Sequence, residues 1–526
     1  FTQRNSSYAP GYIKSDLEEL SNPYSREVAF SEVFPGRELN YGESSVIQTL
    51  NLSYYPKERG PYNLDVDGFD PETGEMLFPE KRWGGIMRKI DNTNFEQSNI
   101  EYIQFWLLDP FMKKDELGNG DGGYLYFNLG EVSEDILKDG LKSYENGLPI
   151  TNDSSYVTTT EWGRVSTKTS LTYAFDNTNG ARILQDVGLD GLSTADEFRH
   201  PSYDKFVTAL KAKLEPYPTT LAAMQEDPFS PLNDPASDNY AFYRHNYYDT
   251  KRFLINDRYK HYNGTDGNSL SQTDASDGQY QTSRSTPDVE DINQDNTLNE
   301  YERYFQYRIH LHPDSMYVGM NCITDKHVAN VHTRNGDTQQ AAWYQFTIPI
   351  SNYQKKVGTI QDFSTIRFMR MFMTGFRATT HLRFASLELV RGEWRNYKYN
   401  LNMRGEHPAN GSISINTVNI EENASREPVN YVLPPGVSRI IDSGSSQIRQ
   451  LNEQSMQLTV DNLDAGDARG VYRNTDLDLR TYKRLQMFVH NEATINNETN
   501  LRNGDISMFI RLGSDVKNNY YEYEIP

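Results

Sequence analysis

Alternating apolar and polar residues mark strands in two separated stretches of the chain. Tyr124–Leu129 reads YLYFNL and alternates with period two, and Ile100–Leu108 ends in an almost continuous apolar run. Similar segments lie further along, at Tyr304–Leu311, Trp343–Ile350, Ile366–Met373 and Leu382–Leu389. Because a strand with one buried face shows this period, the pattern predicts a mainly β protein.

Several strings recur along the chain in a similar order. IQFWL at Ile103–Leu107 returns as MRMFM at Met369–Met373 and as LQMFV at Leu485–Val489. Further pairs are YFNLGEV with FIRLGSD (Tyr126–Val132 and Phe509–Asp515), WYQFTIP with YYEYEIP (Trp343–Pro349 and Tyr520–Pro526), and RWGGIMR with DARGVYR (Arg82–Arg88 and Asp467–Arg473). Recurring strands predict related modules, so we expect repeated β-sandwiches of a jelly-roll-like form.

A segment with a helical pattern and many polar residues separates the first two groups of predicted strands. Within Pro201–Pro216, the string YDKFVTALKAKL places its apolar residues on one helical face, and a stretch rich in Asp, Ser, Asn, Gln and Gly follows. The predicted divisions are an extended lead-in (1–45), sandwich module A (46–160), a helical and Asp/Asn/Ser-rich insertion (161–300), module B (301–400), and module C (401–526), which we expect to be incomplete.

Charge and hydropathy narrow the classes of function. The 526 residues include 52 Lys and Arg against 73 Asp and Glu, which gives a net charge of −21. So acidic a chain is unsuited to binding a nucleic-acid backbone or to binding an anionic leaflet by charge alone. It shows neither a signal peptide nor a stretch of about 20 apolar residues. Its abrupt ends lead us to expect a portion of a longer protein.

The string DINQDNTLNEYE is the sharpest chemical motif in the chain. A calcium loop of the EF-hand type takes oxygen ligands at positions 1, 3, 5, 7, 9 and 12. Those positions hold Asp291, Asn293, Asp295, Thr297 (through its carbonyl), Asn299 and Glu302. A donor set made only of oxygens favours a hard cation, so the motif predicts a structural Ca²⁺. The alternative is an acidic turn without a metal, because Asn296 stands where the motif has glycine.

A weaker calcium candidate is the string DVGLDGLSTADE, which ends at Glu197. Asp186, Asp190 and Glu197 fit the ligand positions, but Gly188 offers no side-chain oxygen at position 3. A turn that caps the following helix is the alternative interpretation. DVDGFD, at Asp65–Asp70, is weaker still. Ions at these sites would hold loops in place and would not take part in a reaction.

Motifs for catalysis are missing from the sequence. It contains no GxSxG string, no P-loop and no GxGxxG opening a helix, which favours a protein that is not an enzyme. Repeated sandwiches with many aromatic residues and structural calcium are also typical of carbohydrate-binding surface proteins, and this class stays open as the alternative. A polysaccharide hydrolase has no motif in its favour.

Long strings of this chain resemble the SprA/Sov family. The strings are RGPYN (Arg59–Asn63), RWGGIMRKI (Arg82–Ile90), IEYIQFWLLDPF (Ile100–Phe111), DVGLDGLSTADE (Asp186–Glu197), EDINQDNTLNEYE (Glu290–Glu302), IRFMRMFMTGF (Ile366–Phe376), GEWRNY (Gly392–Tyr397) and ARGVYR with DLRTYKRLQMFVH (Ala468–His490). They are spread from about residue 59 to the C-terminus, so the resemblance covers most of the chain.

The resemblance implies a role in the type nine secretion system of Bacteroidetes. The family forms a giant outer-membrane translocon whose β-barrel passes folded cargo, and it is tied in some species to gliding motility. This chain would then be an extramembrane portion at the outer membrane or cell surface. The implied partners are a PorV-like outer-membrane barrel, a plug protein and secreted cargo with a C-terminal targeting domain. Membrane association would come through the rest of the parent barrel.

Overall fold

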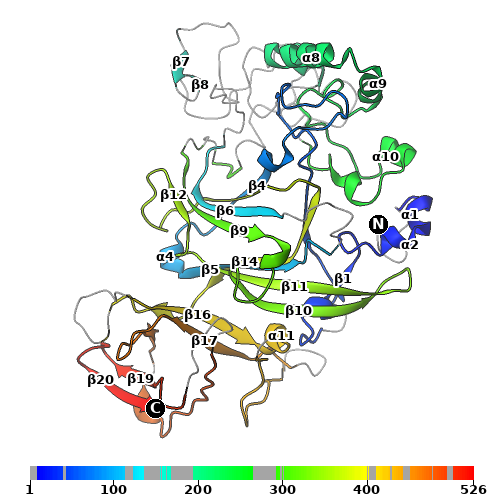
Figure 1. The fold of residues 1–526 in the computed structure, drawn as a ribbon. Coiled ribbons are helices and arrows are strands. Elements are labelled where there is room, and N and C mark those ends of the chain that lie inside the picture. Colours follow the sequence, from blue (N-terminus) through cyan, green and yellow to red (C-terminus); the bar gives the residue numbers. More distant parts are fainter. Residues whose placement is uncertain are drawn as a thin grey trace.

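Two five-stranded antiparallel sheets form a β-sandwich at the centre of the protein (Figure 1). The computed structural model describes residues 9–39, 43–112, 122–134, 155, 157–160, 163–166, 194–264, 292–295, 299, 301–399, 401, 410–426, 429–441, 450–476, 478–493 and 502–525. Within them, several antiparallel sheets and few, mostly short helices confirm the mainly β class.

Each sheet of the sandwich mixes early and late strands of the chain. The first sheet has the order β10 (Ile323–His332), β11 (Thr338–Pro349), β5 (Ile100–Leu108), β14 (Thr380–Arg391) and β3 (Leu50–Tyr54). The second has the order β12 (Lys355–Val357), β9 (Arg303–Leu311), β6 (Gly123–Glu131), β13 (Phe368–Thr374) and β4 (Trp83–Lys89).

Shorter elements surround the sandwich. The helices are α1 (Gly11–Ser15), α2 (Leu17–Leu20), α3 (Phe30–Val33), α4 (Phe95–Ser98), α7 (Thr194–Glu197), α8 (Pro201–Leu214), α9 (Pro218–Glu226), α10 (Asn246–Lys251) and α11 (Ile420–Asn423), with 3₁₀ turns η1 (Pro79–Lys81), η3 (Asn256–Tyr259), η5 (Pro313–Ser315) and η6 (Leu479–Thr481). The remaining strands pair as β1·β2 (Val28–Ala29, Val46–Ile47), β7·β8 (Val157–Thr160, Gly163–Ser166), β15·β18 (Arg395–Asn396, Val471–Tyr472), β16·β17 (Ser412–Asn419, Gln454–Asp461) and β19·β20 (Met508–Gly513, Tyr520–Ile525).

Phe105 of β5 lies at the centre of the sandwich core. Its ring stacks on that of Phe346 in β11, with centroids 4.7 Å apart, and meets Phe384 in β14 at 5.4 Å. Across the core it contacts Phe127 of the second sheet at 5.6 Å. All four rings are buried, so one residue joins both neighbouring strands and the facing sheet. Such aromatic pairs add about 0.5–1.5 kcal/mol each beyond their buried area.

Strands from predicted modules A and B share both sheets. β5, from the stretch 46–160, lies between β11 and β14 from the stretch 301–400, and β6 lies in the same way between β9 and β13. The two stretches therefore build one sandwich, where the sequence predicted one for each, and repeated jelly rolls are not shown. Alternation identifies the buried face of a strand but does not tell which strands pair, so the pattern is compatible with either arrangement.

The N-terminal segment covers the outer face of the first sheet. Tyr24, Val28, Val33 and Phe34 pack against Trp106 and Trp343 there. The segment contains α1 to α3 and β1, so it is not the extended lead-in that its polar sequence predicted. Because β5 is covered on both faces, Phe105 and Leu107 point into the sandwich while Trp106 and Leu108 pack outside it. This double burial explains why the end of β5 reads as a continuous apolar run.

Buried polar contacts fix that segment to the sheet. Arg26 and Glu32 form a buried ion pair, with nitrogen–oxygen distances of 2.8 and 2.6 Å. The Trp343 indole N–H donates to Glu32 at 3.0 Å, and the Arg383 guanidinium donates to the carbonyl of Pro23 at 2.6 Å. A charged pair of this kind is tolerated inside a protein because each partner is also hydrogen-bonded.

The insertion between β6 and β9 begins and ends at two strands that pair with each other. Its helices α8 and α9 lie at one end of the sandwich, opposite β16 to β20 (Figure 1). The helix predicted within Pro201–Pro216 is confirmed as α8, and its apolar face is buried against Phe69, Met76 and Leu232. Pro201 at its first position suits a helix start, where a backbone N–H has no partner anyway. Among the helices described, none is long and apolar enough to cross a membrane.

Helix α11 attaches the C-terminal part to the first sheet. The side chain of Asn419 caps α11 by accepting from the N–H groups of Glu421 and Glu422. Asn423 then donates to the buried carboxylate of Asp325 at 2.6 Å, and Gln345 donates to Glu422 at 2.9 Å. Burial raises the pKa of Asp325 to about 6 and also raises the pKa of Glu422. The contact thus places ionisable groups where their charged forms are disfavoured.

The shared core predicts that the sandwich unfolds as one unit. Phe346→Ala should lower the free energy of unfolding by about 3–5 kcal/mol, because it opens a cavity beside Phe105. Hydrogen exchange should then accelerate together in β5, β6 and β9. Ile86→Ala, on a half-exposed side chain of β4, is the control and should cost about 0.5 kcal/mol or less. Acceleration confined to the strands of residues 301–400 would contradict a single core.

The α11 contact predicts a pH dependence. Because the pKa of Asp325 is about 6 in the folded protein against an ordinary 3.8, the stability it contributes is complete below pH 3.8 and is lost as the pH rises through 6. The full effect is about 3 kcal/mol. Asp325→Asn should therefore lose less stability than the unmodified protein between pH 4 and pH 7, as measured by urea unfolding. Asp314→Asn, on an exposed side chain, should keep the original profile, and identical profiles for all three proteins would refute the assignment.

Candidate metal centre

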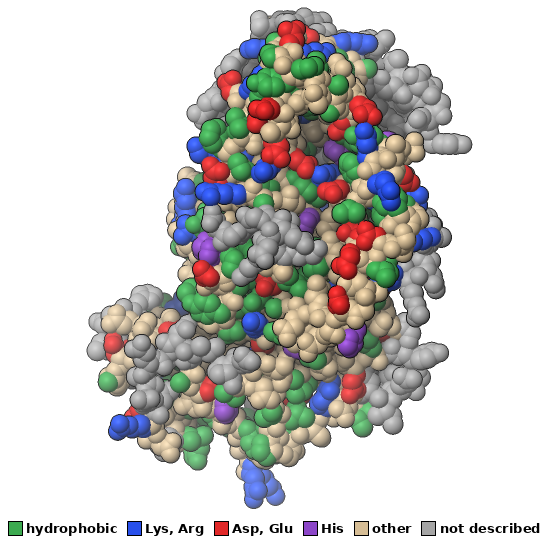
Figure 2. Space-filling model, turned by 45° about the vertical axis from the view of Figure 1, so that its right-hand side comes forward, with side chains coloured by type: hydrophobic (Ala, Val, Ile, Leu, Met, Phe, Trp, Pro, Cys, Tyr) green, Lys and Arg blue, Asp and Glu red, His purple; other side chains and the backbone are tan. Residues whose placement is uncertain are grey.

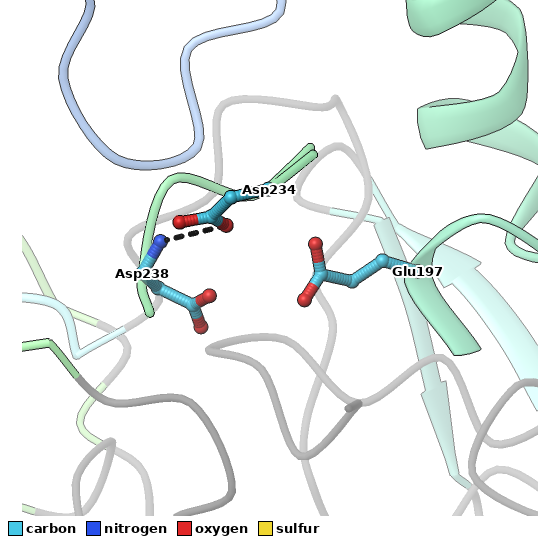
Figure 3. Close-up of side chains that lie close together, drawn as sticks. All are labelled: Glu197, Asp234 and Asp238. Atoms are coloured by element: carbon cyan, nitrogen blue, oxygen red, sulfur yellow. Dashed lines mark hydrogen bonds between the residues drawn. The ribbon is translucent and has the colours of Figure 1, made fainter. Parts of the chain in front are cut away.

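Three buried carboxylates converge in the insertion. Glu197 ends α7, while Asp234 and Asp238 belong to the turn that follows α9. One ligand oxygen from each lies within 4.8 Å of the other two, and all three residues are buried. Figure 3 shows the carboxylates of Glu197 and Asp238 facing a common space beside Asp234. Since such a cluster is costly in the absence of positive charge, its neighbours decide what it can do.

Backbone N–H groups of one short loop orient these carboxylates. Asp234 accepts from the N–H of Asp238 at 3.3 Å (Figure 3) and from that of Asn239 at 3.2 Å. Glu197 accepts from the N–H of Ala236 at 2.9 Å. The loop sequence NDPASDN suits this geometry, because an Asp side chain readily accepts from the backbone of the residues after it. Burial nevertheless raises the pKa of Asp234.

Arg59 supplies positive charge to the cluster. Its guanidinium donates to the carbonyls of Asn63, at 2.5 Å, and Pro235, and it lies over the ring of Phe206. Burial lowers the pKa of Arg59 to about 10, while the nearby carboxylates of Asp234, Glu197 and Asp238 act in the opposite direction. Arg59 thus offsets part of the negative charge of the three carboxylates, and the Tyr62 hydroxyl also donates to Asp238 at 3.3 Å.

The geometry fits a divalent cation with oxygen ligands. Calcium binds oxygens at about 2.3–2.6 Å, so two oxygens on one ion can be up to roughly 5 Å apart. The three ligand oxygens lie within 4.8 Å of one another, which agrees with this span. A donor set without His or Cys favours Ca²⁺ or Mg²⁺ over zinc. The triad could therefore hold a metal ion that would join α7 to the loop after α9.

Only one residue of this triad was predicted from the sequence. Glu197 is the last residue of the weaker calcium motif, whose other ligands Asp186 and Asp190 lie outside the described residues. Asp234 and Asp238 were missed because they follow Glu197 by 37 and 41 residues, which matches no ligand spacing. The repeated Asp and Asn residues of NDPASDN mark a turn, but nothing in them indicates a neighbour so far back in the chain.

The stronger motif has its described residues held by protein groups. Arg370 donates twice to the carboxylate of Glu302, at 3.1 Å each, and Arg367 donates to the side-chain oxygen of Asn299 at 3.1 Å. Asn293 and Asp295 bond to each other at 3.0 Å. Asp291 and Thr297 lie outside the described residues. Calcium binding by this loop stays a prediction, with arginines now known to bind two of its expected ligands.

Glu134 is a buried anchor for the same loop that the sequence did not reveal. It follows β6, and its two oxygens accept from the N–H of Ile292 at 3.0 Å and from the N–H and side-chain amide of Asn299 at 2.9 and 3.1 Å. Hydrogen bonds to a charged group contribute about 1.5–3 kcal/mol each. A carboxylate from the segment after β6 thus fixes the backbone of a loop whose sequence resembles a metal-binding loop.

The weakest candidate, DVDGFD, is an ordinary turn stabilised by its own aspartates. Asp65 accepts from the N–H of Gly68 at 2.9 Å and from Arg82 at 2.8 Å, and these contacts hold its pKa below the usual range. Asp70 accepts from the N–H of Glu72 at 2.9 Å and from Thr73 at 3.0 Å, which lowers its pKa in the same way. Donors from the protein therefore satisfy both carboxylates.

Calcium is expected to stabilise the protein through the triad. At a free concentration of 100 times its dissociation constant, an ion that binds only the folded state adds about 2.7 kcal/mol. Asp238→Asn should abolish the calcium-induced rise in Tm, while Asp295→Asn, in the other loop, should keep it. The comparison uses the shift within each variant, so a change in basal stability does not affect it. Loss of the response in Asp295→Asn alone would place the ion at residues 291–302, and no response in any protein would make the triad a metal-free ion cluster.

Comparison with known proteins gives the family. No curated protein matches the chain. A family model named SprA_N and described as "Motility related/secretion protein" matches residues 206–526, from within α8 to the last strand, which is more than half of the 526 residues. This match confirms the resemblance seen in the strings of the sequence. The chain therefore belongs to the SprA_N family of motility-related secretion proteins.

Proposed function

We propose that this chain is a non-catalytic scaffold in the extramembrane part of an outer-membrane translocon that exports folded cargo in type nine secretion and supports gliding motility. Membership of the SprA_N family supports a role in secretion. The observation that carries the scaffold role is the pairing of β3 with β14, in which Leu50–Tyr54 meets Thr380–Phe384. Distant parts of the chain are thereby closed into one sandwich, whose core strands are expected to open only with the whole unit.

The sandwich also holds the insertion as a projecting platform. The chain leaves at the end of β6 and returns at the start of β9, and these strands are direct neighbours. Contacts across the base fix the platform: Lys213 of α8 donates to the carbonyl of Val66 at 2.7 Å, and Thr220 of α9 donates to that of Glu72 at 2.9 Å. We propose that this platform is a docking surface for partners.

A structural ion would stiffen the same junction. Glu197 precedes α8, Asp234 follows α9, and Arg59 lies between β3 and β4, so the carboxylate cluster joins the insertion to the segment that leads into the sandwich. We propose Ca²⁺ as its occupant. The ion would act on shape alone, by holding two loops of the platform at a fixed separation.

Charge gives the surface a second property. Acidic and basic side chains are interspersed over the face seen in Figure 2, and the whole chain carries a net charge of −21. A mixed but acidic surface repels acidic proteins at long range. We propose that it limits nonspecific adhesion of cargo. Specific partners would be a PorV-like barrel, a plug protein and cargo with a C-terminal targeting domain.

Carbohydrate binding at the cell surface is the alternative. Its specific support is Trp83 at the start of the edge strand β4, whose side chain is 72% exposed. An exposed indole ring on a rigid strand can stack on a sugar. This alternative needs no barrel and would place the protein outside any translocon.

Cell fractionation with antiserum against this chain separates the two functions. The scaffold role predicts a band several times larger than 60.6 kDa in the outer membrane, which co-purifies with a small barrel and with secreted cargo. An inner-membrane marker and a periplasmic marker are the controls for the fractions. A soluble or secreted band near 60 kDa would refute the translocon role. The next measurement would then compare glycan binding by the unmodified protein and by the Trp83→Ala variant.

A further inference from the structure

The last hairpin of the chain carries an apolar face whose β20 side is largely exposed in the part of the chain that the structure describes. β19 and β20 form a two-stranded sheet, and on β20 the side chains of Tyr521, Tyr523 and Ile525 are 86%, 68% and 40% exposed. They alternate along the strand, so all three lie on one face. A row of large apolar side chains in water is unusual for a folded strand and points to a missing neighbour.

The same face exists, fully buried, inside the sandwich. β6·β9 and β19·β20 are both antiparallel, and their strings align as YFNLGE with FIRLGS and as YFQYRI with YYEYEI. The pairing therefore makes β20 the counterpart of β9, whereas its sequence likeness to Trp343–Pro349 suggested β11, which pairs with β10 and β5. The registers coincide: Gly130, Leu129, Phe127 and Leu125 oppose Tyr304, Phe305, Tyr307 and Ile309, as Gly513, Leu512, Ile510 and Met508 oppose Tyr520, Tyr521, Tyr523 and Ile525. In β6·β9 the apolar residues of this face have almost no exposure.

A glycine marks the same position in both hairpins. A Cβ atom at Gly130 would overlap the carbonyl oxygen of Arg303, and one at Gly513 would overlap that of Asn519. In each case the obstructing residue directly precedes the tyrosine opposite the glycine. Glycine is therefore needed for close approach of the two backbones at equivalent points. This requirement is independent of the apolar pattern and supports the same alignment.

The elements before β19 repeat the order of those before β6. β18 lies in the string that echoes β4, and η6 follows it as α4 follows β4. Asn94 caps α4 by accepting from the N–H of Gln97, and Asp478 caps η6 by accepting from that of Arg480. Next comes LQMFV, the echo of β5. It has the pattern of a strand, yet it forms none, and Leu485 is 65% exposed.

Strand order explains why this segment is not paired. In the sandwich, β5 lies between β11 and β14, and β6 pairs with β9 on one edge and with β13 on the other. β11, β13 and β14 all come after β9 in the chain. In a second unit built in the same order, the equivalents of these three strands would follow β20, the counterpart of β9. The β19·β20 pair of a second copy is not an equivalent of these strands, because in the sandwich β6·β9 faces the other sheet and not a second hairpin of its own type.

We infer that β18, the segment 485–489, β19 and β20 are the equivalents of β4, β5, β6 and β9 in a second sandwich with the strand order of the first. The occupant of its open face is a set of strands equivalent to β11, β13 and β14, which follow β20 in the same polypeptide. When they are in place, LQMFV becomes the central strand of one sheet and β19 that of the other. This inference does not rest on the proposed role in secretion.

Hydrogen exchange on two lengths of the protein tests the inference. One protein is this chain, and the other continues with native sequence by at least the 80 residues that separate the end of β9 at Leu311 from the end of β14 at Arg391 (391 − 311). The longer protein should show amide exchange slower by about 100-fold or more in residues 485–489, 508–513 and 520–525. Exchange in β6 and β9 is the internal control and should be equal in both.

Two results would overturn the inference. One is equal exchange of the three segments in both proteins. The other is protection in the shorter protein that increases with its concentration, which would make a second copy the occupant.

Paired substitutions give an independent reading. Tyr523→Lys should lower the Tm of the longer protein by several degrees and leave that of the shorter protein unchanged, because only the longer protein buries this position. Glu524→Gln, on the opposite face of β20, is the control and should leave both unchanged, because the amide oxygen can still accept from Ser507. A Tyr523→Lys variant that is silent in both lengths would contradict a covered face.

Discussion

The contacts of Phe105 with Phe346, Phe384 and Phe127 commit distant parts of the chain to one core. Strands that begin at residue 50 and end at residue 391 must all be in place before this ring is fully buried. The N-terminal segment, the insertion and the C-terminal part are then each fixed to a sandwich that already exists. Few of the local contacts of those three parts would hold them in position without it.

Buried carboxylates are the second recurring device. Glu134 holds the loop at residues 292–299, Glu197 holds the loop after α9, and Glu32 holds the N-terminal segment to Trp343. In each case an acid accepts hydrogen bonds from a segment far away in the sequence. Hydrogen bonds to a carboxylate are strong where water is excluded. Burial also disfavours the charged form, so it raises the pKa of a carboxyl group whose charge is not fully balanced, as at Asp325. Part of the acidity of this chain is therefore internal and structural.

The same chemistry explains why a calcium motif in the sequence does not by itself identify a calcium site. A loop of Asp and Asn residues ending in Glu suits a cation, and it suits arginines and backbone N–H groups equally well. In the loop at residues 292–302, Arg367 binds Asn299 and Arg370 binds Glu302 directly, while Glu197 lies beside two further carboxylates with Arg59 nearby. The groups that face each loop distinguish the two cases, and they come from segments that are remote in the chain.

The sequence alone determined the β class, the helix at Pro201–Leu214, the SprA resemblance and the residues that alternate on each strand, because all of these depend on local periodicity or on whole strings. Only the tertiary structure decided that the two stretches share one sandwich, that Glu197 meets Asp234 and Asp238, and that Glu302 meets Arg370. Pairing and charge contacts join residues that are far apart in the chain, and a pattern of period two carries no record of its partner. The exposed face of β20 lies between these cases: its apolar residues are plain in the sequence, but only the shared register with β9 shows what should cover them.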